Sequence, residues 1–276
     1  MDVASVVAGK TLEALGVQTN YHEQGGGAPV VLLHGSGLGV SAYANWARTI
    51  PVLAKHFRVI APDCAGFGHS DPADDIVFGM DYWVRHMVAF LDAIGVERAS
   101  FIGNSFGGAL AVAIAAQHPN RVDRLMLMGS AGVDFVPPPV FGIDLSKGLT
   151  GEVMLQIVRM FTYHPDQVTD EMVQLRLQTA LRPGAMARQA RLFPGEARIS
   201  RVTSLITPAQ LVATIERPTL LVHGRDDRIV PPATSFRLHE LIAGSDLHIF
   251  SRCGHWSQVD RFDEFNALAT SFLSQS

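Results

Sequence analysis

The 276-residue sequence has few cysteines and little charge. Its two cysteines, Cys64 and Cys253, are too few for a disulfide framework, and neither lies in a Cys/His pattern with metal-ligand spacing. We therefore expect two reduced thiols and no metal site. Charged residues make up 17% of the chain and apolar residues 47%, which excludes a disordered protein. The formal net charge is −4 and no basic block is present, which excludes nucleic acid as the main partner.

Long hydrophobic runs are also missing. The longest candidate, residues 109–116, is far shorter than the roughly 20 residues needed to span a membrane, and it predicts a buried helix. Residues 1–5 lack the basic and apolar regions of a signal peptide. We therefore expect a cytoplasmic protein that makes no membrane contact. The length fits one large domain or two small ones, and either can bury a sizeable core.

Short apolar runs alternate with helical patterns along much of the chain. Continuous apolar strands are typical of a parallel sheet whose two faces are both covered by helices. Strands are predicted at 30–33, 57–61, 99–102, 125–128, 220–222 and 247–250, and helices at 81–94, 107–118 and 260–273. The fold class predicted is therefore α/β, with a mostly parallel sheet.

The alternation stops over residues 134–208. This stretch begins with three prolines at 137–139 and then carries helical patterns at 151–161 and 169–181, without strand signals. It predicts a helical lid (134–208) inserted into one core formed by residues 1–133 and 209–276. The alternative is a helical subdomain with only a packing role.

The motif GNSFGG at 103–108 follows a predicted strand and precedes a predicted helix. A Gly-x-Ser-x-Gly turn in that context forces its serine into a tight bend and exposes the hydroxyl above the sheet edge, which predicts Ser105 as a nucleophile. The amides at the start of the helix favour developing negative charge there. The alternative is a glycine-rich turn that merely packs.

A serine nucleophile needs a base, and the base needs a carboxylate to fix its tautomer. His255 follows the last predicted strand, in the motif CGHW. Asp226 and Asp227 follow the preceding strand, so the order Ser, Asp, His is the one expected for an α/β-hydrolase. Asp134, after the strand at 125–128, is a weaker candidate for the acid.

The glycine-rich segment HGSGLG at 34–39 follows the first long apolar strand. Its backbone can direct an N–H at an oxyanion, together with the N–H of Phe106, the residue after the nucleophile. A dinucleotide-binding loop is excluded because no GxGxxG pattern opens a helix here. The three elements together predict a serine hydrolase.

Several longer motifs resemble one family, the meta-cleavage product hydrolases. The resemblance covers nearly the whole chain, and the motifs that carry it are TNYH at 19–22, HGSG at 34–37, VSAYANW at 40–46, GNSFGG at 103–108, GRDD at 224–227 and CGHW at 253–256. Members of this family hydrolyse a C–C bond in 2-hydroxy-6-oxohexa-2,4-dienoates, the ring-fission products of catechols, and need no cofactor. The resemblance implies this reaction, the α/β-hydrolase fold and a homo-oligomer, either a dimer or a larger assembly.

The resemblance also implies roles for individual residues. The triad is Ser105, Asp227 and His255, since the second aspartate of the pair matches the family acid. Oxyanion-hole amides come from Ser36 or Gly37 and from Phe106. Positions that line the substrate pocket are Asn45, Asn104, Trp256, Phe161 and Ile229.

Arg176 matches the carboxylate-binding arginine of the family, after FTY at 161–163 and VTDE at 168–171. A buried carboxylate needs a charge partner, and arginine can hold it through two hydrogen bonds. Arg182 and Arg188 are nearby rivals, and a solvent-exposed Arg176 is the alternative. Leu38 stands where the family commonly has proline, which alters the stiffness of the oxyanion loop.

Breaking a C–C bond needs a carbon leaving group stabilised by a carbonyl, which ketonisation of the dienoate provides. The hypothesis is that His255 moves the protons and Ser105 attacks the C6 ketone. The runner-up is a carboxylesterase or lactonase with the same triad, and a further alternative is an inactive fold used for ligand sensing. A dehalogenase or epoxide hydrolase is disfavoured because position 105 is not aspartate. The sequence leaves the C6 substituent open, alkyl or aryl.

Overall fold

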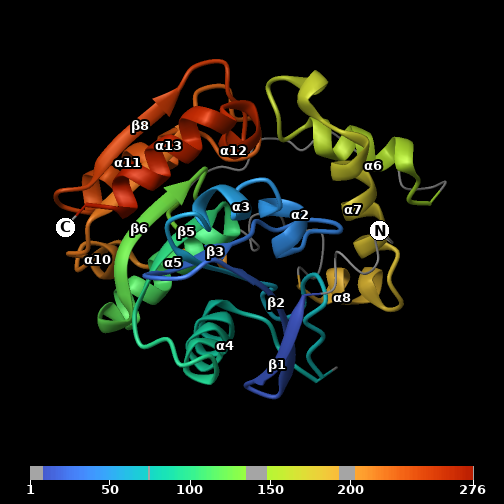
Figure 1. Ribbon diagram of the computed structural model, residues 1–276, viewed down its shortest axis with the longest axis horizontal. Coiled ribbons are helices and arrows are strands. Elements are labelled where there is room, and N and C mark those ends of the chain that lie inside the picture. The colour runs from blue at the N-terminus through green and yellow to red at the C-terminus, as the bar shows by residue number, and fades with distance from the viewer. Residues whose placement is uncertain (1–8, 74, 135–147, 193–202, 276) are drawn as a thin grey trace.

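The computed structural model describes residues 9–73, 75–134, 148–192 and 203–275. Its centre is an eight-stranded sheet in the order β1-β2-β4-β3-β5-β6-β7-β8 (Figure 1). The strands are β1 (Lys10–Ala14), β2 (Val17–Gln24), β3 (Pro29–Leu33), β4 (Arg58–Pro62), β5 (Ala99–Asn104), β6 (Val122–Met128), β7 (Thr219–Gly224) and β8 (Asp246–Phe250). From β4 to β8 all neighbours are parallel, whereas β2 pairs antiparallel with both β1 and β4.

Helices cover both faces of this sheet. The helices in the described part of the chain are α2 (Ala42–Trp46), α3 (Ile50–Leu53), α4 (Met80–Ala93), α5 (Phe106–Gln117), α6 (Gly151–Arg159), α7 (Asp170–Ala180), α8 (Ala185–Leu192), α10 (Ala209–Val212), α11 (Ala233–Leu241), α12 (Ser257–Asp260) and α13 (Phe262–Leu273). One apolar cluster joins α4, α5 and α11 to the sheet, and a second joins α2, α3 and α13. Because the strands are buried on both faces, continuous apolar runs were sufficient to predict them.

All six strands predicted from apolar runs are present, with ends shifted by a few residues. The predicted last helix is wrong in one respect: α12 ends at Asp260 and a separate helix, α13, begins at Phe262. The antiparallel strands β1 and β2 were not predicted. Lys10–Ala14 lies at the sheet edge and is mostly exposed, so it carries no apolar run that would mark a strand.

Helices α6, α7 and α8 lie together on one side of the molecule, in the part of the chain between β6 and β7 (Figure 1). Residues 135–147 and 193–202 of the predicted lid lie outside the described residues. An apolar cluster that includes Met154, Val158 and Val173 packs α6 and α7 against Trp256 and Val259 of the core. These two helices are thereby joined to the loop that carries His255.

No helix within the described ranges is long and apolar enough to cross a membrane. In that same part of the chain, no group of three or more His, Cys, Asp and Glu side chains is placed to hold a metal ion.

Candidate active site

Ser105 occupies the sharp turn between β5 and α5. Its backbone has φ +55° and ψ −111°, a strained conformation for a residue with a side chain. The turn is held because the Ser105 N–H donates to the carbonyl of Met128 at 3.0 Å. A Cβ atom at Gly107 would lie 2.3 Å from the carbonyl oxygen of Leu33, so only glycine lets α5 begin so close to β3. The turn has the geometry expected of a nucleophile elbow.

His255 and Asp227 form a direct hydrogen bond. Nδ1 of His255 lies 2.7 Å from Oδ2 of Asp227, and both side chains are buried. The other carboxylate oxygen, Oδ1, accepts the backbone N–H groups of Ile229 at 2.7 Å and Val230 at 3.0 Å. Since Asp227 is fixed by its own loop, it can hold the imidazole of His255 in one tautomer and orientation.

A second histidine, His223, contacts the same carboxylate. Its Nε2 lies 3.2 Å from Oδ2 of Asp227 and 3.0 Å from the carbonyl oxygen of Val230. Both of these neighbours are acceptors, so Nε2 must carry a hydrogen. Nδ1 of His223 is 2.7 Å from the hydroxyl of Ser235, which can donate to it. His223 therefore donates to Oδ2 of Asp227, whereas the backbone N–H groups of Ile229 and Val230 donate to Oδ1.

The environment of Asp227 keeps it ionised. Burial raises the pKa of Asp227, but the electrostatic interaction with His255 and the hydrogen bonds from His223 and His255 outweigh burial and hold the pKa well below its ordinary value. The other two candidate acids lie elsewhere. Asp226 forms an ion pair with Arg225 at 3.6 Å, and Asp134 is exposed. Of the three candidates, Asp227 alone contacts His255.

Two glycines let the surrounding loops approach the predicted triad. A Cβ atom at Gly129, which has φ +51°, would lie 3.0 Å from Nδ1 of His255. A Cβ atom at Gly35 would lie 3.6 Å from Cβ of Ser105. The loop after β3 and the loop after β6 therefore border the predicted base and the predicted nucleophile from two directions.

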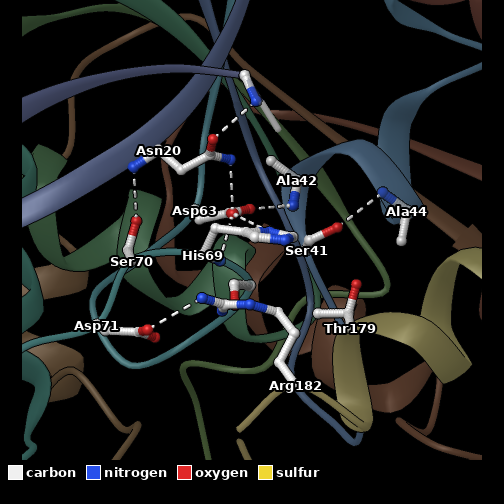
Figure 2. A network of polar contacts seen from close by, with 12 residues as sticks. Asn20, Ser41, Ala42, Ala44, Asp63, His69, Ser70, Asp71, Thr179 and Arg182 are labelled. Carbon is white, nitrogen blue, oxygen red and sulfur yellow. Dashed lines mark hydrogen bonds and ion pairs between the residues drawn. The ribbon is translucent and has the colours of Figure 1, made fainter. Parts of the chain in front are cut away.

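The glycine-rich loop after β3 is anchored by buried polar groups (Figure 2). Asp63, at the end of β4, accepts the N–H of Ala42 at 2.6 Å and the side-chain amide of Asn20 at 2.9 Å. Burial raises the pKa of Asp63, but contacts with His69 and the N–H of Ala42 outweigh burial and lower it overall. His34 joins the same loop to β4, because its Nε2 accepts the N–H of Cys64 at 2.9 Å. These contacts fix both ends of the segment that carries the predicted oxyanion amides.

The three predicted oxyanion residues lie in the loop after β3 and at the start of α5. Ser36 and Gly37 are half-buried in the loop after β3, and Phe106 is fully buried at the first position of α5. Ile229 lies in the loop after β7, where its backbone supports Asp227. Its side chain is half-buried.

Arg176 of α7 is buried in the site, with 1% of its surface exposed. Its guanidinium carbon lies 5.4 Å from the ring centre of Phe161 and 5.3 Å from that of Trp256. One Nη donates to the carbonyl of Leu38 at 3.1 Å, whereas Nε has no hydrogen-bond partner among the described residues. Burial lowers the pKa of Arg176 to about 10, so it remains charged at neutral pH.

Arg176 has no carboxylate within ion-pair distance in the described part of the chain, and the rival arginines do. Arg182 and Arg188 each contact a carboxylate oxygen of Asp71 at 3.0 Å. Figure 2 shows Arg182 directed at Asp71, below the Asp63 network. A buried cation without a counter-ion is costly unless a ligand supplies the negative charge. Of the three arginines, Arg176 therefore fits an anionic ligand best.

The remaining predicted pocket residues gather near Arg176 and Ser105. Phe161 and Trp256 stack with ring centres 4.8 Å apart, and Phe161 also lies 5.9 Å from the ring of His255. Asn45 and Asn104 are buried, and each has one side-chain atom without a partner among the residues described. Buried polar atoms without partners are rare in proteins, so these point to a polar ligand.

A cleft of about 940 Å³ opens between α2, α7 and α12, and Asn45 and Trp256 line it. Met172 and Leu175 of α7 also line it. The cleft therefore reaches two of the residues predicted to bind substrate.

Three residues around the site were not predicted from the sequence: His223, Asp63 and Asp260. His223 lies at the carboxyl end of β7, and Asp63 directly follows the carboxyl end of β4. Asp260 ends α12, the short helix that follows His255. These positions were the available signal, since the carboxyl ends of parallel strands meet at one edge of a sheet. Sequence spacing alone did not reveal their partners: His223 contacts Asp227 only four residues along, whereas Asp63 and Asp260 also contact distant segments.

Comparisons with known proteins agree with this architecture. A family model described as "alpha/beta hydrolase fold" matches residues 28–173 and 188–262. The chain is 43% identical to a 2-hydroxy-6-oxo-2,4-heptadienoate hydrolase from Pseudomonas putida over 96% of both proteins. It is 42% identical to a 2-hydroxymuconate semialdehyde hydrolase from a Pseudomonas species, over 97% of this chain and 94% of the relative. The structure of the meta-cleavage product hydrolase CumD from Pseudomonas fluorescens, complexed with acetates, superposes with a TM-score of 0.91 at 43% identity, covering 97% of this chain and 98% of that one.

Proposed function

Because this chain belongs to the meta-cleavage product hydrolases, a family with the α/β-hydrolase fold, we propose that it hydrolyses the C–C bond of 2-hydroxy-6-oxohexa-2,4-dienoates formed in the degradation of aromatic compounds. Ser105, His255 and Asp227 form the catalytic triad. The substrate is a small molecule, and the reaction uses no cofactor.

The observation that carries this proposal is the buried Arg176 beside two aromatic rings. A neutral ester does not need a buried cation, whereas the C1 carboxylate of a dienoate supplies the negative charge that Arg176 lacks among the described residues. The flat, conjugated carbon chain fits against the stacked rings of Phe161 and Trp256. Asn45 and Asn104 supply the polar contacts for its oxygen atoms.

The reaction proceeds in two stages. First, the 2-hydroxyl loses a proton and C5 gains one, which gives a 2,6-diketone. Ser105 then gives its proton to His255 and attacks the C6 carbonyl, whose oxyanion is held by N–H groups of Ser36 or Gly37 and Phe106. The C5–C6 bond breaks, and its electron pair moves through the conjugated chain onto the C2 oxygen. This releases 2-hydroxypenta-2,4-dienoate after protonation, and water then hydrolyses the acyl group from Ser105.

The C6 substituent is proposed to be small. The two relatives above are named for a semialdehyde and a heptadienoate, in which C6 carries hydrogen or one further carbon. Loss of dienolate absorbance should therefore be several-fold faster with the 6-methyl than with the 6-phenyl ring-fission product. A 6-phenyl substrate that is turned over faster would contradict the assignment of the substituent.

The same assay separates this activity from that of an esterase or lactonase. The expected result is rapid dienoate turnover with little hydrolysis of p-nitrophenyl acetate, and rapid quench with labelled substrate should trap an acyl group on Ser105. Ester hydrolysis without dienoate turnover would overturn the proposal. Quenching that never traps acyl-Ser105 would overturn nucleophilic attack and favour activation of water by His255.

The part of the chain between β6 and β7 is proposed to act as a lid over this site, and the protein is proposed to be a cytoplasmic dimer. Light scattering on the purified enzyme measures the assembly directly, with a mass near twice 29.9 kDa expected. A mass near 29.9 kDa would contradict the dimer.

A further inference from the structure

Asp260, at the end of α12, is a buried carboxylate that binds backbone from two distant segments. Its Oδ2 accepts the N–H of Tyr163 at 2.8 Å and the N–H of Gly254 at 2.7 Å. Its Oδ1 accepts the N–H of His164 at 3.0 Å. The side chain is nearly inaccessible, with 5% of the residue exposed. One side chain therefore joins the segment after α6 to the loop that carries His255.

Both joined segments carry groups of the candidate active site. Gly254 directly precedes His255, and Tyr163 lies two residues after Phe161, whose ring contacts both His255 and Arg176. The segments also bond to each other, because the N–H of Trp256 donates to the carbonyl of Phe161 at 2.9 Å.

The space between the two segments leaves no room for a side chain. A Cβ atom at Gly254 would lie 2.9 Å from the carbonyl oxygen of Phe161 and from the N–H nitrogen of Tyr163. The segments are therefore packed backbone against backbone, and Asp260 closes the end of this contact.

We propose that Asp260 is a positioning residue that fastens the lid segment 161–164 to the catalytic loop 254–256. In this role, Asp260 fixes the position of His255, which acts at the C6 end of the substrate. That position is fixed relative to Phe161 and Arg176, which contact the C1 end. This inference rests on the proposed function, in which one substrate must reach both groups at once.

The chemistry of the site requires a carboxylate at this position. Three N–H donors converge on it, and an ionised carboxylate is the side chain that only accepts hydrogen bonds. An asparagine of the same shape would turn an NH₂ group toward at least one backbone N–H. The substitution Asp260→Asn therefore loosens the contact between the segments while it keeps the volume of the side chain.

The test compares Asp260→Asn with Asp263→Asn, which removes the same charge from an exposed residue at the start of α13. A dienoate needs both ends of the site, whereas p-nitrophenyl acetate needs only the triad and the oxyanion amides. The ratio of kcat/KM for the 6-methyl dienoate to kcat/KM for the ester should fall about tenfold or more in Asp260→Asn, the effect of losing about one good hydrogen bond to a charged group. It should stay unchanged in Asp263→Asn. An equal fall for both substrates, or no fall, would overturn the proposal.

Amide hydrogen exchange tests the same link without any substrate. In Asp260→Asn, peptides that cover 161–167 and 251–257 should lose protection together, while peptides from α4 keep theirs. Faster exchange in only one of the two segments would contradict the link. If wild-type enzyme fails to turn over the dienoate, the proposed function fails, and the exchange result still decides the role of Asp260. If Asp260→Asn does not fold, Asp260→Glu, which keeps the acceptors on a longer arm, should show the same joint change to a smaller degree.

Discussion

At the scale of single residues, the buried charge of Arg176 is energetically unfavourable in the unliganded protein. The guanidinium is buried against aromatic rings, with one hydrogen bond to a backbone carbonyl, and burial has lowered its pKa to about 10. Such a charge costs folding free energy that a bound carboxylate recovers. Arginine at position 176 is therefore expected to favour substrate binding and to lower the stability of the fold.

The substitution Arg176→Met tests this opposition. Methionine packs well against Phe161 and Trp256, so the free energy of unfolding should rise by about 1 kcal/mol or more in urea titrations. At the same time, kcat/KM for the dienoate should fall by about 100-fold or more, because the substrate carboxylate loses its partner. The control Arg182→Met removes a partly exposed ion pair with Asp71 and should change both quantities little. A less stable Arg176→Met protein would contradict the cost assigned to the buried charge.

The two cysteines give a second prediction at this scale. Cys64 and Cys253 are at most 1% exposed, and burial raises the pKa of Cys253 to about 12. Because the thiolate is the reactive form, neither should react with a disulfide reagent in the folded enzyme, and both should react in urea. A thiol titrated rapidly under native conditions would show that one of these side chains is accessible.

At the scale of elements, the turn between β5 and α5 depends on close backbone contact with β3. The substitution Gly107→Ala places a methyl group 2.3 Å from the carbonyl oxygen of Leu33, so backbone must move. We expect the free energy of unfolding to fall by about 1–3 kcal/mol, as for other overpacked sites, with reduced activity because Ser105 shifts. The control Gly26→Ala, where nothing lies within 4 Å of the added carbon, should leave both unchanged. An unchanged Gly107→Ala protein would mean that this contact does not hold the turn.

The elements also show what sequence patterns can and cannot predict. The parallel strands and the motif around Ser105 were predictable because two-faced burial leaves an apolar run and the turn requires glycine at fixed spacing. The strands β1 and β2 were missed because neither carries a continuous apolar run: β1 is a mostly exposed edge strand, and β2, although partly buried, consists mostly of polar residues. His223 and Asp260 were missed for different reasons. No motif marks a histidine that donates to Asp227, four residues along, and the backbone amides that Asp260 binds at Tyr163 and His164 lie in a distant segment.

At the scale of the whole molecule, buried carboxylates make stability depend on pH. Asp63 and Asp227 both have pKa values below the ordinary value of 3.8 in the folded protein. A group whose folded pKa is lowered contributes stability above its unfolded pKa and loses that contribution as the pH falls through the folded value. The free energy of unfolding should therefore decline as the pH is lowered from 5 towards 2.

Urea unfolding at several pH values checks this dependence. Asp63→Asn should be less stable than wild type at pH 7, and its decline below pH 4 should be shallower by about 1.4 kcal/mol for each pKa unit that Asp63 is shifted. A stability that is flat between pH 5 and pH 3, or an equal slope in Asp63→Asn, would contradict the low folded pKa of Asp63.

The role of Ser105 as the nucleophile is tested most directly by comparing wild type with Ser105→Ala on the 6-methyl dienoate under single-turnover conditions. If Ser105 is the nucleophile and the rest of the site binds the substrate, Ser105→Ala should bind the dienoate with a dissociation constant within a few-fold of the wild-type value. Its release of 2-hydroxypenta-2,4-dienoate should be slower by about 10³-fold or more. Release of that product by Ser105→Ala at nearly the wild-type rate would contradict the central claim that this chain cleaves the C–C bond through Ser105.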